Sequence, residues 1–191
     1  KRACAKDTTA ISTPLRRRID MTQLAAGRFL LAKSSLDGTY FGKRIVLLLN
    51  YDPAEGAYGL VINRVARIPL NEVFRGIPKQ HRRQHAFFLG GPVEEHHVQL
   101  LQVSRSEEGE TLLPQPERHS IDIQELLKTI DDPSTRAFLG YSGWAPGQLE
   151  SELERDDWEI HAADPMAVLN IAEELSGVEP EEFKRQFGAI Y

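Results

Sequence analysis

The sequence of 191 residues predicts an α+β domain. Three observations support this class: short apolar runs of strand type fill the first half, hairpin-sized turns join several of them, and helical periodicity is concentrated in the second half. The regular strand-helix-strand alternation of a doubly wound sheet is not seen in the pattern. With 41% apolar and 27% charged residues, the composition is that of an ordinary folded domain.

The chain starts with a basic extension. Residues 1–20 contain six basic and two acidic residues and no apolar signal-peptide centre, so we expect a disordered extension over 1–20 and a single domain over 21–191. The one cysteine, Cys4, lies in this extension, which favours an idle thiol in the reducing cytoplasm. No stretch approaches the ~18 apolar residues of a membrane span, so we expect no contact with a membrane.

Three strands are predicted before residue 64. Gly27–Lys33 forms the first, and the continuous apolar run Arg44–Asn50 predicts a strand that is buried on both faces. After the turn-forming residues 52–56, Ala57–Asn63 returns as the second half of a hairpin. Gly59 lies inside that strand and indicates a bulge or a close backbone approach.

The middle of the chain predicts shorter elements. These are a short helix over Leu70–Phe74, a basic surface loop over 75–84, a strand over Ala86–Leu89, a strand over His96–Val103 and a charged turn over 104–109.

The last third mixes helices and strands. The predicted elements are a helix over Ile121–Ile130, a strand over Arg136–Tyr141, a helix over Gln148–Arg155, a strand over Trp158–Ala162, a helix capped by Asp164 and ended by Gly177, and a helix over Glu181–Phe187.

Four segments resemble the YqgE/AlgH family of small bacterial proteins. They are Ala25–Phe41, Gly56–Arg64, Leu89–Val93, and Phe138–Leu153 together with Trp158. The resemblance extends over residues 22–187. It implies a bent mixed sheet that forms a barrel-like centre with helices packed outside, and it brings no established set of catalytic residues. One branch of the family carries a transcriptional-regulator label.

Twelve residues of these segments are family-motif positions with a structural or binding role. They are Gly59, Asn63, Arg64, Gly90, Gly91, Pro92, Gly140, Tyr141, Gly143, Trp144, Gln148 and Leu149. We expect Trp144 and Trp158 to anchor the chain to the core, each with one indole N–H to satisfy. Asn63 is expected to hold a turn through its side chain, and Arg64 to pair with a carboxylate of the second half.

The leading hypothesis is therefore a non-enzymatic interaction or regulatory domain. The alternative enzyme is a hydrolase with Ser142 as nucleophile, because Ser142 is predicted to follow a strand and precede a helix. Against it, the nucleophile motif needs a glycine two residues after the serine, where Trp144 stands. The family also often has alanine at position 142.

No cofactor or metal site is predicted. The six histidines lack the spacing of a ligand set, and Gly90-Gly91-Pro92 lacks the lysine and hydroxyl residue of a phosphate loop. Glu150, Glu152 and Glu154 step by two along a predicted helix, so they fan around it and are expected to form a solvated acidic face.

Charge is distributed unevenly. Residues 21–91 include 10 basic and 4 acidic residues, a net charge of +6. Residues 92–191 include 7 basic and 22 acidic residues, a net charge of −15. We expect the two halves to neutralise each other in the fold. The densest basic cluster, Arg75, Lys79, Arg82 and Arg83, is a candidate anion-binding segment. It is read either as a solvated loop or as the contact of a nucleic-acid-associated transcriptional regulator.

Overall fold

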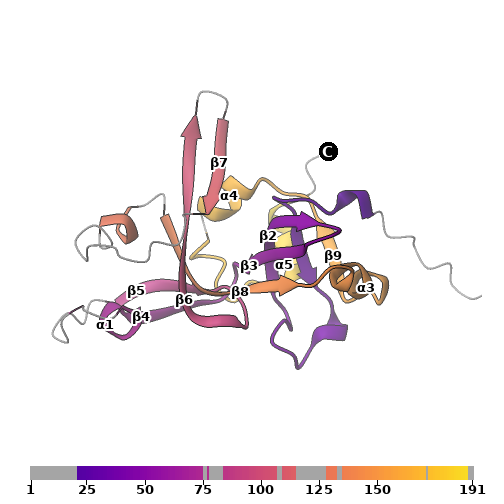
Figure 1. Ribbon diagram of the computed structural model, residues 1–191, viewed down its shortest axis with the longest axis horizontal. Helices are drawn as coiled ribbons and strands as arrows, with labels where there is room; N and C mark the ends of the chain where they lie inside the picture. The colour runs from indigo at the N-terminus through magenta and orange to yellow at the C-terminus, as the bar shows by residue number, and fades with distance from the viewer. Residues whose placement is uncertain are drawn as a thin grey trace, which may run out of the picture.

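The computed structural model describes residues 21–74, 77, 84–106, 109–114, 128–132, 135–170 and 172–188. In these residues, a mixed nine-stranded sheet curls into a half-barrel with helices packed against it (Figure 1). The predicted α+β class with a bent mixed sheet is confirmed. The predicted extension, residues 1–20, lies outside the described residues.

The strands are β1 (Phe29–Ala32), β2 (Ile45–Asp52), β3 (Gly56–Val61), β4 (Val65–Pro69), β5 (Gln84–Leu89), β6 (Val93–Ser106), β7 (Gly109–Pro114), β8 (Thr135–Trp144) and β9 (Trp158–His161). The helices are α1 (Leu70–Val73), α3 (Gln148–Glu154), α4 (Pro165–Asn170) and α5 (Pro180–Gln186). Two short 3-10 turns span Met21–Gln23 and Ser34–Leu36.

Strand β8 belongs to two half-sheets. Its C-terminal part pairs with β3, which continues through β2 and β1 to β9, and we call this set the first half-sheet. Its N-terminal part lies between β5 and β6 and makes the second half-sheet together with β4 and β7. Pairing is antiparallel throughout except between β5 and β8.

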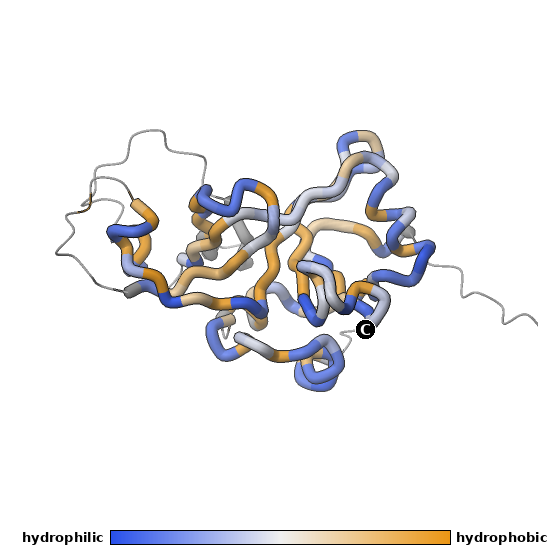
Figure 2. Tube along the Cα trace, turned by 90° about the horizontal axis from the view of Figure 1, so that it is seen from below, coloured by the Kyte–Doolittle hydropathy of each residue, from blue (hydrophilic) through white to orange (hydrophobic). Residues whose placement is uncertain are grey.

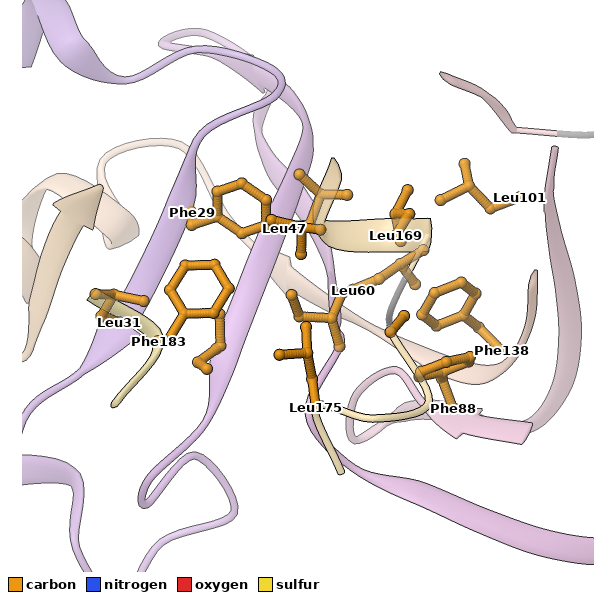
Figure 3. Close-up of a cluster of buried hydrophobic side chains, with 14 residues drawn as sticks. Phe29, Leu31, Leu47, Leu60, Phe88, Leu101, Phe138, Leu169, Leu175 and Phe183 are labelled. Carbon is orange, nitrogen blue, oxygen red and sulfur yellow. The ribbon is translucent and has the colours of Figure 1, made fainter. Parts of the chain in front are cut away.

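The first half-sheet is buried on both faces, which explains its continuous apolar strands. Alternate side chains of β1 and β2 enter opposite cores, because successive residues of a strand point to opposite faces. Phe29 and Leu47 face a core that α4 and α5 close with Leu169 and Phe183 (Figure 3). Leu30 and its neighbours on that face pack against α3.

The second half-sheet has a smaller core of its own. Phe87 of β5 and Ala137 of β8 are buried there against Leu70 of α1 and Ile130. Figure 2 shows the result along the chain, with hydrophobic stretches running through the strands and hydrophilic residues gathered mainly at the turns.

Most predicted elements are confirmed within one to three residues. The β2–β3 hairpin forms, with Val46 opposite Val61, and Met166 N donates to Asp164 Oδ1 at 2.9 Å at the start of α4. Two differences stand out. The helix that begins at Pro165 ends at Asn170, well before Gly177, and β8 runs through the expected turn to Trp144.

Three further differences concern strands of the second half-sheet. Strands β4 and β7 were not predicted, and β6 extends the predicted strand at both ends. Figure 1 shows the β6–β7 hairpin projecting away from the rest of the sheet. Residues 121–127, most of one predicted helix, lie outside the described residues.

Candidate functional site

Three motif glycines meet where β8 passes from one half-sheet to the other. Gly140 has a φ of 66°, and a Cβ on Gly90 would lie 2.5 Å from the Gly140 carbonyl oxygen. A Cβ on Gly91 would lie 2.0 Å from the Tyr141 carbonyl oxygen. Only glycine fits such contacts, since a side chain here would overlap fixed backbone. We call this place the β8 junction.

Gly59 makes a similar approach on the neighbouring strand. A Cβ on Gly59 would lie 2.7 Å from the carbonyl oxygen of Leu47, and the register of β2 against β3 shifts between Leu48 and Asn50. The predicted close approach is therefore present, and the irregularity lies on the partner strand.

Ser142 lies inside β8, and the prediction that it follows a strand is wrong. The side chain is fully buried, and its hydroxyl donates a hydrogen bond to the carbonyl oxygen of Gly90 at 3.0 Å. A carbonyl oxygen is too weak a base to activate a serine. The hydroxyl thus contributes a hydrogen bond to the β8 junction, and its geometry offers no support for a nucleophile.

One carboxylate holds both tryptophans. Trp144 and Trp158 are 5% and 2% exposed, and each indole N–H donates to Oε2 of Glu152 at 2.8 Å. Gln148 Nε2 donates to the other oxygen, Oε1, at 3.0 Å. The tryptophans are anchored as expected, through a partner on α3 that the sequence had assigned to a solvated face.

Glu150 departs from the solvated face too. Its carboxylate accepts a hydrogen bond from the hydroxyl of Tyr51 at 2.7 Å. Burial and this hydrogen bond raise the pKa of Tyr51 to about 12. Of the three glutamates, Glu154 is the one that is exposed.

Asn63 joins three segments through its side chain. It is buried, its Oδ1 accepts from Ile45 N at 3.1 Å, and its Nδ2 donates to the carbonyl oxygens of Lys43 and Val178 at 2.9 and 2.7 Å. These bonds tie the start of β2 to the end of β3 and to the approach to α5.

The next residue, Arg64, stacks on a ring. Its guanidinium carbon lies 5.2 Å from the ring centroid of Tyr40, a cation–π contact. The Tyr40 hydroxyl donates to the carbonyl oxygen of Leu89 at 3.4 Å, beside the β8 junction. The expected ion pair of Arg64 with a carboxylate is not found among the described residues.

Arg44 accompanies this pair. It is half-buried, and its Nε is a buried donor without a hydrogen-bond partner in the described part of the chain. Burial lowers the pKa of Arg44, and the positive charge of Arg64 lowers it further. Sequence reasoning missed both Tyr40 and Arg44. The hairpin pattern held a signal for Arg44, because the residue before β2 must lie near the residues after β3.

Other basic residues of the first half do find carboxylates of the second. Lys33 pairs with Asp156 at 2.5 Å, Lys43 with Glu179 at 2.8 Å and Arg67 with Glu173 at 3.3 Å. These three ion pairs join the two halves of the chain, and among the described residues Arg44 and Arg64 form no such pair.

A cavity of about 210 Å³ lies on the second half-sheet, away from the family motifs. Its polar lining consists of His85, Asp131, Asp132, Thr135, Arg136 and Glu173, and none of the twelve motif residues lines it.

The described residues contain no cluster of three metal-ligating side chains. The basic candidates Arg75, Lys79, Arg82 and Arg83 lie outside the described residues. Of the helices in the described ranges, none has the length and apolarity to cross a bilayer.

Comparisons with known proteins agree with the motif segments. Residues 29–177 match the model of a family described as AlgH-like. A UPF0301 protein of Myxococcus xanthus is 37% identical over 162 residues, which is 78% of this chain and 84% of that protein. A UPF0301 protein of Mycobacterium tuberculosis is 30% identical over 158 residues, which is 77% of this chain and 76% of that protein.

Two solved structures share the fold. The solution structure of AlgH from Pseudomonas aeruginosa has a TM-score of 0.58 at 24% identity, over 90% of both chains. The crystal structure of a Corynebacterium diphtheriae protein has a TM-score of 0.50 at 20% identity, over 74% of this chain and 78% of that one. Three of these four names designate a family, and none of the four states a reaction.

Proposed function

We propose that this chain, which belongs to the AlgH-like family, is a non-enzymatic interaction or regulatory domain. One observation carries the proposal: Ser142, Asn63 and Gln148, polar residues of the family segments, are engaged in hydrogen bonds within the protein. Ser142 bonds a carbonyl oxygen, Asn63 bonds three backbone groups, and Gln148 bonds the carboxylate that holds the tryptophans. Ser142 and Asn63 are buried as well as hydrogen-bonded, so neither side chain is exposed to act as a nucleophile or a base on a substrate.

The same arrangement suits a binding platform. The β8 junction fixes the ends of β3 and β5, and Tyr40, bonded to Leu89 beside it, carries the Arg64 guanidinium on its ring. Tyr40, Arg44 and Arg64 are all half-buried. Such a preorganised surface favours recognition, because little side-chain freedom is lost on binding. A cytoplasmic location belongs to the proposal, since a reducing compartment suits a chain with one cysteine.

Turnover assays test the non-enzymatic assignment. The wild-type protein and Ser142→Ala are incubated with a phosphoester, an acyl ester and a nucleotide, and product is measured over time. We expect no protein-dependent turnover from either. Turnover by the wild type that disappears in Ser142→Ala would contradict the proposal and restore the hydrolase alternative.

Nucleic-acid binding through the basic segment stays a prediction. The prediction is based on four basic residues within nine positions of the sequence, Arg75, Lys79, Arg82 and Arg83. Gel shifts at two salt concentrations test it, since phosphate contacts weaken as salt rises. A shift that is lost in the double variant Arg82→Ala/Arg83→Ala supports this function, and a shift unaffected by that change argues against it.

A further inference from the structure

Arg44 and Arg64 are neighbouring cations, and neither has a counterion among the residues that the structure describes. Arg44 directly precedes β2 and Arg64 lies three residues after β3, and the hairpin brings them together because Val46 is opposite Val61. Their proximity is also seen in the lowered pKa of Arg44, to which burial contributes most and Arg64 next. Within the described residues, neither forms an ion pair, and Arg44 Nε has no acceptor.

This arrangement is unfavourable in the free protein. A buried donor that has lost water without gaining an acceptor destabilises the fold, and two like charges side by side repel. Carboxylates are plentiful, since the chain has 28 acidic residues, and Lys33, Lys43 and Arg67 each pair with one. Unlike these three residues, Arg44 and Arg64 have no carboxylate partner in the described part of the chain.

Glu95 is a carboxylate whose charge acts on Tyr40, the ring on which Arg64 stacks. Its charge raises the pKa of Tyr40, where burial has the larger effect and Arg64 acts in the opposite direction. Glu95 is exposed, and in the described part of the chain it makes no ion pair with either arginine. An incoming anion therefore meets two unneutralised guanidinium groups and one exposed carboxylate at the edge of the site.

We propose that Arg44 and Arg64 bind a phosphate group, either inorganic phosphate or the phosphate of a small phosphorylated molecule. Guanidinium groups present planar pairs of N–H donors that match the oxygens of phosphate, and such charge-assisted hydrogen bonds are strong. Tyr40 is a positioning residue: its ring carries the Arg64 guanidinium, and its hydroxyl is bonded to Leu89. The inference rests on the proposed function, for which it supplies the ligand class.

Calorimetric titration with inorganic phosphate, and separately with a phosphomonoester, tests the site. We expect the wild type to bind, and Arg44→Gln and Arg64→Leu each to weaken binding by at least about tenfold, the loss expected for one charge-assisted contact. Arg67→Leu is the matched control, because it removes an exposed, already paired arginine from the same half. Tighter binding of one ligand identifies the source of the phosphate group.

Two further variants test the positioning role. Tyr40→Phe keeps the ring under Arg64 and is expected to retain phosphate affinity, whereas Tyr40→Leu removes the ring and is expected to weaken it. Thermal unfolding with and without phosphate provides a second readout, because a ligand that binds the folded state raises Tm. This rise is expected in the wild type and in Arg67→Leu, and not in Arg64→Leu.

Three results would overturn the site: no phosphate binding by the wild type, binding unchanged in both Arg44→Gln and Arg64→Leu, or an equal loss in Arg67→Leu, which indicates a general charge effect. Each leaves the non-enzymatic proposal standing. A different result separates the two proposals in the other direction. If the wild type hydrolyses the phosphomonoester and Arg64→Leu does not, the phosphate site is supported and the non-enzymatic function is contradicted.

Discussion

Glu152 shows how a single residue can organise a motif. Its two carboxylate oxygens receive both tryptophan indoles and the side-chain amide of Gln148. The tryptophans lie in the core between α3 and the first half-sheet, where Trp144 and Trp158 contact each other edge to face at 6.0 Å between ring centroids. Buried N–H groups require an acceptor, and this carboxylate supplies it for two at once.

Removing this acceptor is expected to destabilise the protein. Glu152→Ala leaves two buried indole donors unpaired, and we expect a loss of roughly 2 to 6 kcal/mol in the free energy of unfolding, at about 1–3 kcal/mol for each donor. Glu152→Gln keeps an acceptor oxygen and is expected to lose clearly less. Chemical denaturation measures both, with the exposed Glu174→Ala as control. Equal stability of Glu152→Ala and wild type would contradict the role.

Tyr51 provides a prediction of pH dependence. Its pKa is about 12 in the folded protein against an ordinary value of 10.0, because of burial and the bond to Glu150. A pKa raised by folding means that the folded state holds the proton longer, so this contribution to stability is full below pH 10 and is lost as the pH rises toward 12.

Titration of tyrosinate absorbance checks this assignment. We expect the wild type to show a component near pH 12 that is missing in Tyr51→Phe. Glu150→Gln is expected to move that component toward pH 10, since the negative charge beside the hydroxyl is removed. A Tyr51→Phe curve that loses amplitude near pH 10 and keeps any component near pH 12 would show that Tyr51 ionises in the ordinary range.

Among the elements, α5 depends on one aromatic anchor. Phe183 is fully buried, and its ring centroid lies 5.2 Å from that of Phe29 on β1 and 4.9 Å from that of Phe187. The spacing of Phe183 and Phe187 predicts a helix that buries this face, and the structure confirms it. The helix has only seven residues, so its stability comes from this packing.

Truncation of the anchor tests that dependence. Phe183→Ala is expected to cost about 3–5 kcal/mol of unfolding free energy, the range for a buried phenylalanine. The exposed neighbour Glu182→Ala is the control, with an expected change within about 0.5 kcal/mol. If Phe183→Ala and Glu182→Ala have the same denaturation midpoint, α5 is peripheral to the fold.

The elements that the sequence predicted well are those with a strong local signal. The apolar run of β2 and its return in β3 define a hairpin, and Asp164-Pro165 defines a helix start. Strand β4 escaped prediction because its five residues include an arginine and a terminal proline, and edge strands need little apolar surface. The β6–β7 hairpin escaped because its tip, 104–110, is polar and charged and has no hydrophobic alternation.

At the level of the whole molecule, two half-sheets share β8 and enclose cores on both faces. The mixed, curled sheet followed from the family resemblance, since periodicity alone gives strands and not their order. The candidate anion site was out of reach for a related reason. Arg44 and Arg64 become neighbours only through the hairpin, and their lack of a counterion among the described residues is a property of the folded charge distribution.

The central claim is that the motif glycines build the β8 junction and take no part in a reaction. The most direct test is the free energy of unfolding of Gly91→Ala, with Gly188→Ala, where a Cβ meets nothing within 4 Å, as control. We predict that Gly91→Ala loses at least about 3 kcal/mol, because its Cβ would overlap fixed backbone, and that Gly188→Ala stays near wild type. A Gly91→Ala protein as stable as the wild type would contradict the claim.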